Sequence, residues 1–355
     1  MSLVGAFALG LGTAACGGAQ STAVAYTGAT LWDGTDAAPM ENATLVVDGG
    51  RIVAVGADAE VPRGAQTVSL DGRYVIPGLI ESHGHVTGAW ADESVTDPME
   101  RVRADLHLYA RYGVTTVNSL GDDETVIAVR DAAQPTDARA RVLAAGPVIG
   151  GPTSDAASAR AEATANAEMG VDWLKLRVDD NLGSGRKMPW EAVAAVMEVG
   201  RERGIPVATH MFYLEDAKRL LELGTGMLAH SVRDTDVDQE LISMLRESGV
   251  CYVPTLVREV STFVYAERPD FFDDPFFQEH AHPGELERAS DPAFMERMRT
   301  SASAAAYRVA LGQAQENLKV LHDAGVPIAF GTDAGPSARF PGYFEHMELQ
   351  LMVDA

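Results

Sequence analysis

Cysteine is scarce in this chain: its 355 residues contain two, Cys16 and Cys251. Two thiols cannot build a disulfide framework or a cysteine-only metal cage. Basic residues are also few, with 28 Lys and Arg against 51 Asp and Glu and a formal net charge of −23. This balance argues against a nucleic-acid-binding protein, which needs a basic surface to neutralise phosphates. No apolar run reaches the roughly 20 residues that span a bilayer.

The composition is that of a globular chain. Hydrophobic residues make up 46% and charged residues 22%, proportions that exclude a wholly disordered protein. The length suggests one or two domains, and an α/β barrel of roughly 250 residues with a small appendage would account for it. We interpret the acidic excess as a solvated surface, with steering of cationic substrates or a saline environment as alternatives.

Residues 1–22 resemble an export signal. An apolar run at residues 3–11 is followed by small residues and by the tetrapeptide Thr-Ala-Ala-Cys16. This pattern fits a secretory signal with its cleavage site, and it also resembles a bacterial lipobox in which Cys16 would be lipidated. No Lys or Arg precedes Cys16, so the usual positive start is missing. We expect an exported protein, periplasmic or attached to the membrane through lipidated Cys16, with the cytoplasm as the alternative.

The rest of the chain shows two different secondary-structure patterns. Residues 23–74 contain short β-like runs and a hairpin signal at Asp48-Gly49-Gly50, which predicts part of a small N-terminal β-sandwich. Residues 75–355 alternate short apolar strands with alanine-rich helical stretches, which predicts an α/β fold, a TIM-like (β/α)8 barrel. The eight expected strands are Tyr74–Leu79, Val114–Asn118, Arg141–Ala145, Asp172–Arg177, Ile205–His210, Met227–His230, Val250–Thr255 and Val326–Thr332.

A long insertion at residues 258–298, rich in aromatic, proline and acidic residues, precedes the eighth expected strand. It is expected either to fix a long loop or to act as a lid over the barrel. The sequence ends inside what resembles the last barrel helix. The barrel and the sandwich are therefore expected to be incomplete at the C-terminus.

Ionisable residues gather at the carboxyl ends of these strands, where barrel enzymes build their active sites. His83 and His85 are separated by one residue, and alternate side chains of a strand point the same way, so both imidazoles can bind one ion. Lys175 lies among apolar residues on the fourth expected strand, where a charged ammonium is costly. It either pairs with other groups or is deprotonated and used chemically.

Three more expected strands end in groups that can bind metal: His210 ends the fifth, His230 ends the sixth and Asp333 directly follows the eighth. Each alone has an ordinary explanation as a hydrogen-bonded core residue. Five of eight strands ending in such groups is a pattern that coincidence rarely supplies. Imidazole and carboxylate ligands suit zinc and similar divalent ions.

With these residues identified, the chain resembles the amidohydrolase superfamily, in particular its imidazolonepropionase-like and prolidase-like metal-dependent hydrolases. The resemblance covers nearly the whole chain from residue 23. It rests on Pro-Gly-Leu-Ile-Glu-Ser-His83-Gly-His85, Lys175, His210, His230 and Gly-Thr-Asp333. It implies that carbon dioxide carboxylates Lys175, which then bridges two divalent metal ions, expected to be zinc. It assigns His83, His85 and Asp333 to one ion, and His210 and His230 to the other.

The implied function is hydrolysis of a carbon–nitrogen bond in a small amide or cyclic amide. Paired ions lower the pKa of a bridging water, and Asp333 would accept its proton as general base and return it to the leaving nitrogen as general acid. Arg177 and Arg258 are candidates to clamp a substrate carboxylate, with pairing to nearby acids as the alternative. His346 is a candidate to approach the pocket. The Met-Phe-Tyr that follows His210 departs from the prolidase-like pattern, so substrate contacts are expected to differ.

Other functions stay open. A prolidase-like dipeptidase is the second interpretation, and lactone or phosphotriester hydrolysis is the third, because one dimetal centre serves all three. A non-enzymatic, lipid-anchored binding protein is the remaining alternative. The sequence has no Gly-x-Ser-x-Gly elbow, no phosphate-binding glycine loop with its lysine and no dinucleotide fingerprint in a strand–helix context. The expected partner is a small-molecule substrate, and the sequence does not indicate an oligomeric state.

Overall fold

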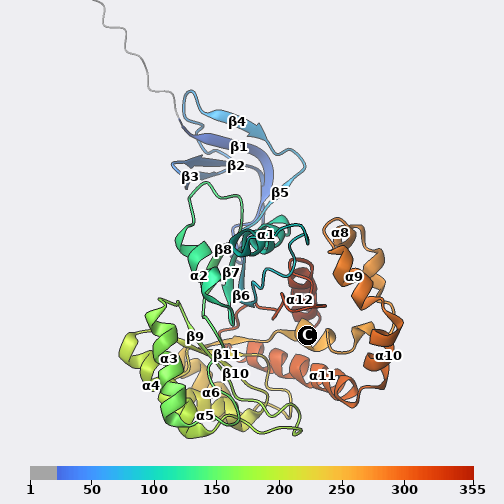
Figure 1. Cartoon of the computed structure of the whole chain (residues 1–355). Helices are drawn as coiled ribbons and strands as arrows, with labels where there is room; N and C mark the ends of the chain where they lie inside the picture. Colours follow the sequence, from blue (N-terminus) through green and yellow to red (C-terminus); the bar gives the residue numbers. More distant parts are fainter. Residues whose placement is uncertain (1–21) are drawn as a thin grey trace, which may run out of the picture. The chain divides into compact units, whose positions relative to one another are not determined.

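A computed structural model of the chain describes residues 22–355, so Cys16 and residues 1–21 of the predicted signal lie outside the described residues. The chain divides into two compact units, Met1–Pro77 and Gly78–Ala355 (Figure 1). The first is built from strands, and the second mixes strands with helices.

The first unit contains one five-stranded sheet. Its strands are β1 (Val24–Leu31), β2 (Met40–Asp48), β3 (Arg51–Gly56), β4 (Gln66–Ser69) and β5 (Tyr74–Val75). Strands β2 and β3 flank β1 on one side in antiparallel pairs, whereas β4 and β5 pair with β1 in parallel. The predicted hairpin is confirmed: Asp48 pairs with Arg51, and Gly49 and Gly50 between them both have positive φ, as a tight hairpin turn requires. A second sheet, which a sandwich needs, is not found among the described residues of this unit.

The second unit has the predicted α/β character. Its strands are β6 (Leu79–Gly84), β7 (Val114–Ser119), β8 (Arg141–Ala144), β9 (Leu174–Arg177), β10 (Val207–His210), β11 (Met227–Ala229) and β12 (Cys251–Val253). They form two parallel sheets, β6-β7-β8 and β9-β10-β11-β12.

Helices alternate with these strands and then dominate the C-terminal third. The first six are α1 (Pro98–Arg111), α2 (Glu124–Asp131), α3 (Ala156–Glu168), α4 (Trp190–Arg203), α5 (Leu214–Glu222) and α6 (Gln239–Ser248). After β12 come α7 (Leu256–Val260), two short 3-10 helices (Val264–Ala266 and Asp270–Asp273), α8 (Pro275–Gln278), α9 (Pro283–Ala289), α10 (Pro292–Thr300), α11 (Ala302–Asp323) and α12 (Tyr343–Asp354).

The first predicted strand, Tyr74–Leu79, is wrong in position. The structure divides this stretch between β5, which ends at Val75, and β6, which begins at Leu79. Pro77 lies between them and has no N–H to donate to a sheet ladder. Strand β6 begins after this proline and extends through His83, so this residue lies inside the strand.

The eighth predicted strand, Val326–Thr332, is not a regular strand. Pro327 cannot donate to a ladder, yet the segment bonds on both sides. On one side the Tyr252 N–H donates to the Pro327 carbonyl (2.9 Å), and Tyr252 forms an isolated parallel bridge with Ile328. On the other side the N–H of Ser82 in β6 donates to this segment (3.0 Å). The segment therefore lies between β12 and β6.

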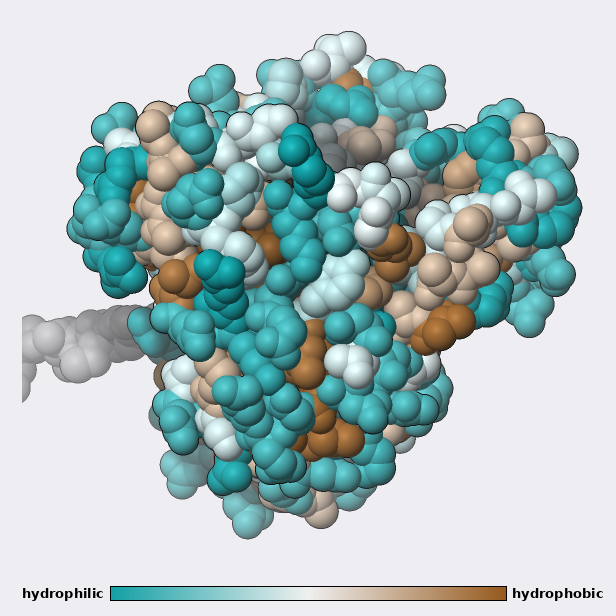
Figure 2. Space-filling view, turned by 90° about the horizontal axis from the view of Figure 1, so that it is seen from below, coloured by the Kyte–Doolittle hydropathy of each residue, from teal (hydrophilic) through white to brown (hydrophobic). Residues whose placement is uncertain are grey.

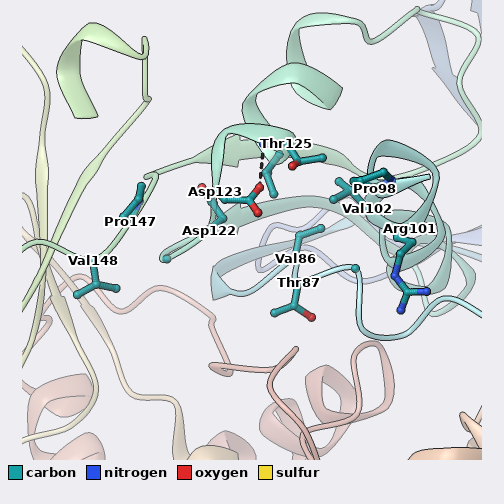
Figure 3. A pocket seen from close by; sticks show the side chains of 13 residues that line it. Val86, Thr87, Pro98, Arg101, Val102, Asp122, Asp123, Thr125, Pro147 and Val148 are labelled. Atoms are coloured by element: carbon teal, nitrogen blue, oxygen red, sulfur yellow. Dashed lines mark hydrogen bonds between the residues drawn. The ribbon is translucent and has the colours of Figure 1, made fainter. Parts of the chain in front are cut away.

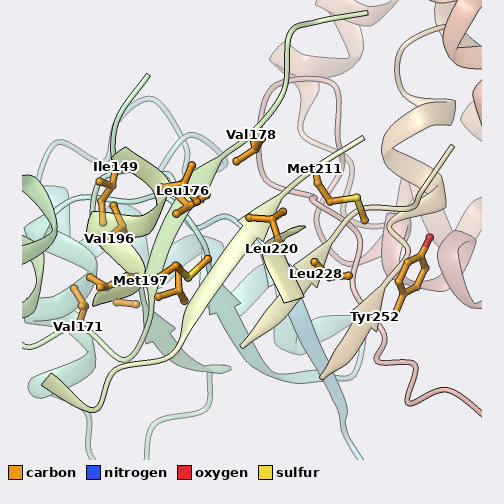
Figure 4. Close-up of a cluster of buried hydrophobic side chains, with 14 of the residues drawn as sticks. Ile149, Val171, Leu176, Val178, Val196, Met197, Met211, Leu220, Leu228 and Tyr252 are labelled. Atoms are coloured by element: carbon orange, nitrogen blue, oxygen red, sulfur yellow. The ribbon is translucent and has the colours of Figure 1, made fainter. Parts of the chain in front are cut away.

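The main hydrophobic core of this unit joins strands to helices (Figure 4). Leu174 and Leu176 of β9 are fully buried and belong to one cluster with Val196 of α4 and Leu220 of α5. Because side chains alternate along a strand, the Lys175 side chain between the two leucines points to the opposite face of the sheet. The same apolar packing that buries β9 thus also orients the buried lysine.

The predicted insertion is largely helical, and an aromatic cluster fixes it to the segment that follows Asp333. The ring of Phe277 in α8 lies 4.9 Å from Phe340 and 5.0 Å from Tyr343, centroid to centroid. In Figure 1, helices α8, α9 and α10 are grouped beside α11 and α12. The aromatic residues of the insertion therefore hold this long segment against the chain that follows Asp333.

The surface seen in Figure 2 is mostly hydrophilic, with apolar residues in small separate patches. Within residues 22–355, no helix combines the length and apolar character needed to cross a membrane.

Replacing Leu176 tests the importance of this core. Leu176→Ala should lower the free energy of unfolding by about 2–5 kcal/mol, because it leaves a cavity against α4. Val309→Ala on α11 removes a side chain that is 76% exposed and should change it by less than about 0.5 kcal/mol. Urea unfolding measures both variants, and equal effects would show that β9 is not packed as described.

Candidate metal centre

Six side chains with metal-binding chemistry converge at the carboxyl ends of the parallel strands. They are His83 of β6 and His85 just after it, Lys175 of β9, His210 of β10, His230 after β11, and Asp333 after the 326–332 segment. His230 (φ 75°) and Asp333 (φ 62°) adopt left-handed backbone conformations, which non-glycine residues seldom occupy. Such strained positions concentrate at functional sites.

One half of the cluster joins two histidines to the aspartate. His85 Nε2 lies 2.7 Å from Asp333 Oδ1, and His83 Nε2 lies 3.7 Å from the same oxygen. One potential ligand atom from each of the three residues falls within 4.8 Å of the other two. Lys175 Nζ lies 3.0 Å from His83 Nε2 and connects this half to the rest of the cluster.

The other half contains His210 and His230, whose ring centroids are 4.2 Å apart. The ring of His83 lies 4.7 Å from that of His230, so the two halves are in contact. Each ring also has an orienting partner: His210 Nε2 is 2.8 Å from Asp179 Oδ2, and His230 Nδ1 is 2.6 Å from the Thr255 hydroxyl. Partners of this kind fix the orientation and tautomer of metal-binding histidines.

Burial keeps the cluster largely uncharged. Loss of solvent lowers the pKa of His83 and His230 well below the ordinary value and that of His210 to about 3, so these imidazoles are neutral at pH 7. Burial also lowers the pKa of Lys175 to about 7, although the carboxylate of Asp333 opposes the shift. Neutral imidazoles have free lone pairs, and an amine of this pKa is partly unprotonated at neutral pH.

Asp333 remains ionised despite its burial. Burial alone would raise its pKa, but Arg339, the hydrogen bond with His85 and the other nearby histidines hold it well below the ordinary value. Arg339 Nη1 lies 2.5 Å from Asp333 Oδ2, and Arg258 Nε lies 3.9 Å from the same oxygen. The carboxylate is therefore anchored on one oxygen by arginine, and its other oxygen faces His83 and His85.

The three residues predicted to contact substrate, Arg177, Arg258 and His346, each have another partner in the fold. Arg177 pairs with Asp179 (3.1 Å), and Arg258 pairs with Glu259 (3.1 Å), which is the pairing considered as the alternative. His346 contacts Tyr112 and none of the six clustered side chains: its Nε2 lies 2.8 Å from the Tyr112 carbonyl, and its ring centroid lies 6.2 Å from that of Tyr112.

Several residues of the site were not predicted from the sequence. Glu81, two residues before His83, is fully buried and accepts from the His83 N–H (2.6 Å) and from the hydroxyl of Thr332 (2.8 Å). Because Glu81 and His83 are two residues apart on one strand, their side chains point to the same face, and this spacing could have predicted that Glu81 lies at the site. The contacts of Asp179 with His210 and of Arg339 with Asp333 gave no such signal, because the spacing of these residues in the sequence does not indicate that they meet.

A cavity of about 430 Å³ opens beside the first histidine pair (Figure 3). Its wall combines apolar Val86 and Val148 with polar Asp122, from the segments that follow β6, β7 and β8. Gly121 also lines it, and its carbonyl lies 3.3 Å from His85 Nδ1. Gly121 therefore lies between the cavity and His85, none of the six clustered side chains lines the cavity, and its volume has room for a small molecule.

A glycine packed against His85 provides a test of this geometry. Gly335 has a φ of 110°, and a Cβ atom there would overlap the carbonyl oxygen of His85. Gly335→Ala should therefore lower the melting temperature. Gly312, exposed on α11 with open space around it, is the matched control: Gly312→Ala should raise stability by up to about 1 kcal/mol through helix propensity. An unchanged or higher melting temperature in Gly335→Ala would contradict the close packing at His85.

Comparison with known proteins gives a consistent result. Residues 74–354 match the amidohydrolase family. An uncharacterized protein of Mycobacterium tuberculosis (strain ATCC 25618 / H37Rv) is 24% identical over 297 residues, which cover 77% of this chain and 67% of the relative. An imidazolonepropionase of Klebsiella pneumoniae (strain 342) is 33% identical over 95 residues, or 27% of this chain and 22% of that protein.

Solved structures agree on the fold. A Xaa-Pro dipeptidase with bound methionine in its active site aligns with a TM-score of 0.69 at 23% identity, covering 94% of this chain and 84% of that one. The ochratoxinase of A. niger aligns with a TM-score of 0.66 at 17% identity, covering 94% and 80%. The family match spans most of the chain, and this chain therefore belongs to the amidohydrolase family, as a hydrolase that acts on carbon–nitrogen bonds.

Proposed function

We propose that this protein hydrolyses an amide or cyclic amide of a small molecule at a centre of two divalent metal ions, expected to be zinc. The observation that carries the proposal is the convergence of six side chains: His83, His85, Lys175, His210, His230 and Asp333. His83, His85 and Asp333 would hold one ion, His210 and His230 the other, and a carboxylated Lys175 would bridge both.

The donor atoms fit such ions. The three buried imidazoles are neutral, and His83 Nδ1 is a buried nitrogen with no hydrogen-bond partner in the described part of the chain. Imidazole nitrogen and carboxylate oxygen are the ligands that zinc prefers alongside thiolate. Carboxylation would convert Lys175 from a buried base into an anion, which two cations stabilise.

We also infer that the second unit is a (β/α)8 barrel whose mouth holds this centre. Hydrogen bonds that bridge the two parallel sheets support the inference. Between β8 and β9, the N–H of Ile149 donates to the Lys175 carbonyl (2.8 Å). Between β12 and β6, the 326–332 segment accepts from Tyr252 and Ser82. Eight segments connected in this way make a ring, and the carboxyl ends of barrel strands are where such enzymes bind substrates.

The side chains have distinct roles in the proposed reaction. Paired divalent ions, when bound, lower the pKa of a shared water and polarise a substrate carbonyl. Asp333 accepts the proton of the attacking water and passes it to the leaving nitrogen. Arg339 holds the carboxylate of Asp333 in place and keeps its pKa low, so that it is ionised before the reaction begins. Arg258 Nε lies 3.9 Å from the same carboxylate. Asp179 and Thr255 orient the rings of His210 and His230.

Metal content tests the centre itself. After zinc-supplemented expression, elemental analysis should find about two zinc ions per chain. His210→Ala should lose about one, because the second site then keeps fewer ligands. His322→Ala, which removes an exposed histidine of α11, should retain the full amount. Trace metal in the wild-type protein, or equal metal in both variants, would contradict the proposal.

The reaction class needs a screen of small amides, dipeptides, lactones and phosphotriesters on zinc-loaded protein. We expect release of ammonia or amine from amides, and an Asp333→Asn variant should lower kcat by about 100-fold or more because it removes the proton acceptor. Turnover confined to lactones or phosphotriesters would replace amide hydrolysis with one of the alternative reactions. Turnover unaffected by Asp333→Asn would exclude the proton transfer assigned to this residue.

A further inference from the structure

The start of helix α7 is capped by a side chain from another helix. The first N–H groups of a helix lack partners within it, and a threonine at the N-cap position normally offers its hydroxyl oxygen to one of them. Thr255 is the N-cap residue of α7, but its side chain makes no such bond. The N–H groups of Leu256 and Val257 instead donate to the two carboxylate oxygens of Glu348 in α12 (2.8 and 2.6 Å). Glu348 therefore takes the place of the usual cap.

The hydroxyl of Thr255 lies instead at the metal-binding cluster, 2.6 Å from His230 Nδ1. Thr255 and His230 both have left-handed backbone conformations, with φ of 49° and 75°, which β-branched residues in particular seldom adopt. The His230 N–H donates to the Val253 carbonyl (2.9 Å), and the Ser231 hydroxyl donates to the Pro254 carbonyl (3.0 Å). The turns after β11 and β12 are thus bonded to each other where the hydroxyl meets the imidazole.

The carboxyl group of Glu348 and the start of α7 depend on each other. Glu348, Leu256 and Val257 are all fully buried. Burial raises the pKa of Glu348 to about 8, and the N–H groups of Val257 and Leu256 oppose this shift. Buried polar groups are costly without partners. Loss of the carboxylate would leave two buried donors unpaired, and Thr255, as the N-cap residue, is placed to turn its hydroxyl toward one of them.

We propose that Glu348 is a positioning residue of the metal centre, which acts through Thr255 on His230. Because Glu348 accepts from the start of α7, the Thr255 hydroxyl oxygen is left to accept from the His230 Nδ1–H. The proton then stays on Nδ1, and the Nε2 lone pair is free for an ion. The inference rests on the proposed function for the identity of the ion, whereas the hydrogen-bond chain from α12 to His230 does not depend on it.

The position of the proton on His230 can be measured by NMR in the metal-free protein with isotope-labelled histidine. Ring-nitrogen shifts distinguish protonation at Nδ1 from protonation at Nε2, and the signals missing in His230→Gln identify this residue. At about pH 9, above the pKa of Glu348, wild-type His230 should carry its proton on Nδ1. Glu348→Gln and Thr255→Val should each shift the proton toward Nε2. The double variant should shift it no further than Thr255→Val alone, because both changes act through one hydroxyl.

Glu345→Gln is the matched control. Glu345 lies on the same helix and is equally buried, but it accepts from the N–H of Gly342 and from the hydroxyl of Thr332. This variant should keep the wild-type proton position on His230. Wild-type His230 protonated at Nε2, or an unchanged His230 in Glu348→Gln, would overturn the proposal. Equal shifts in the two glutamate variants would also overturn it, because they would reflect a general loosening of α12.

Zinc binding gives a second readout, measured by competition with a chelator. Glu348→Gln should weaken the binding of one zinc ion about tenfold, as loss of the support of a metal-binding histidine does. The ion assigned to His83, His85 and Asp333 should keep its affinity. Wild-type protein that binds no zinc would refute the proposed function, and the NMR result would still decide the role of Glu348. Equal affinities in a zinc-binding wild type and in Glu348→Gln would overturn the positioning role alone.

Discussion

Lys175 is buried at the centre of the second unit, 3.0 Å from a histidine nitrogen, and the ionised carboxylate of Asp333 is among the groups that act on it. Removing an ammonium ion from water costs several kcal/mol even after a protein relaxes around it, and burial accordingly lowers the pKa of Lys175 to about 7. Leu174 and Leu176 pack into the core on the opposite face of β9, and Lys175 itself is only 3% exposed. A buried cluster of neutral imidazoles, an amine of lowered pKa and one carboxylate can be stabilised by bound metal cations, because its nitrogen and oxygen atoms have lone pairs that are not occupied by protons.

The surroundings of the cluster hold its members in position. Glu81 binds the backbone of His83 and the hydroxyl of Thr332, which links β6 to the segment that carries Asp333. Asp105 of α1 accepts three backbone N–H groups, from Thr87, Gly88 and Trp90, and so fixes the loop after His85. The hydrogen bond from Thr332 to Glu81 fixes the residue next to Asp333, and the Thr255 hydroxyl, 2.6 Å from His230 Nδ1, fixes the ring of His230. Left-handed residues persist where the surrounding structure holds them in this way.

The metal-binding candidates could be predicted from the sequence because each lies at or near the end of a short apolar run. Strand ends in a parallel α/β fold meet at one edge, so local pattern was enough to gather His210, His230 and Asp333. Strand limits near prolines were not predictable in the same way: Pro77 and Pro327 remove donors at positions where hydrophobicity alone suggests a continuous strand.

Charge pairing was the least predictable feature, because it depends on residues that are distant in sequence or that share a turn. For Arg258 the sequence leaves open a substrate clamp or pairing with a nearby acid, and in the fold it pairs with Glu259 and lies against the ring of Tyr307. Arg339 lies in a loop without periodicity, and its contact with Asp333 could not be read from spacing.

The central claim, a two-ion centre bridged by a carboxylated lysine, is tested most directly by anomalous diffraction at the zinc absorption edge from zinc-loaded crystals. The account predicts two anomalous peaks about 3.5–4 Å apart, surrounded by His83, His85, Lys175, His210, His230 and Asp333, with additional density extending from Lys175 Nζ. Zinc peaks located only at other residues, or an unmodified Lys175 pointing away from two bound ions, would contradict it.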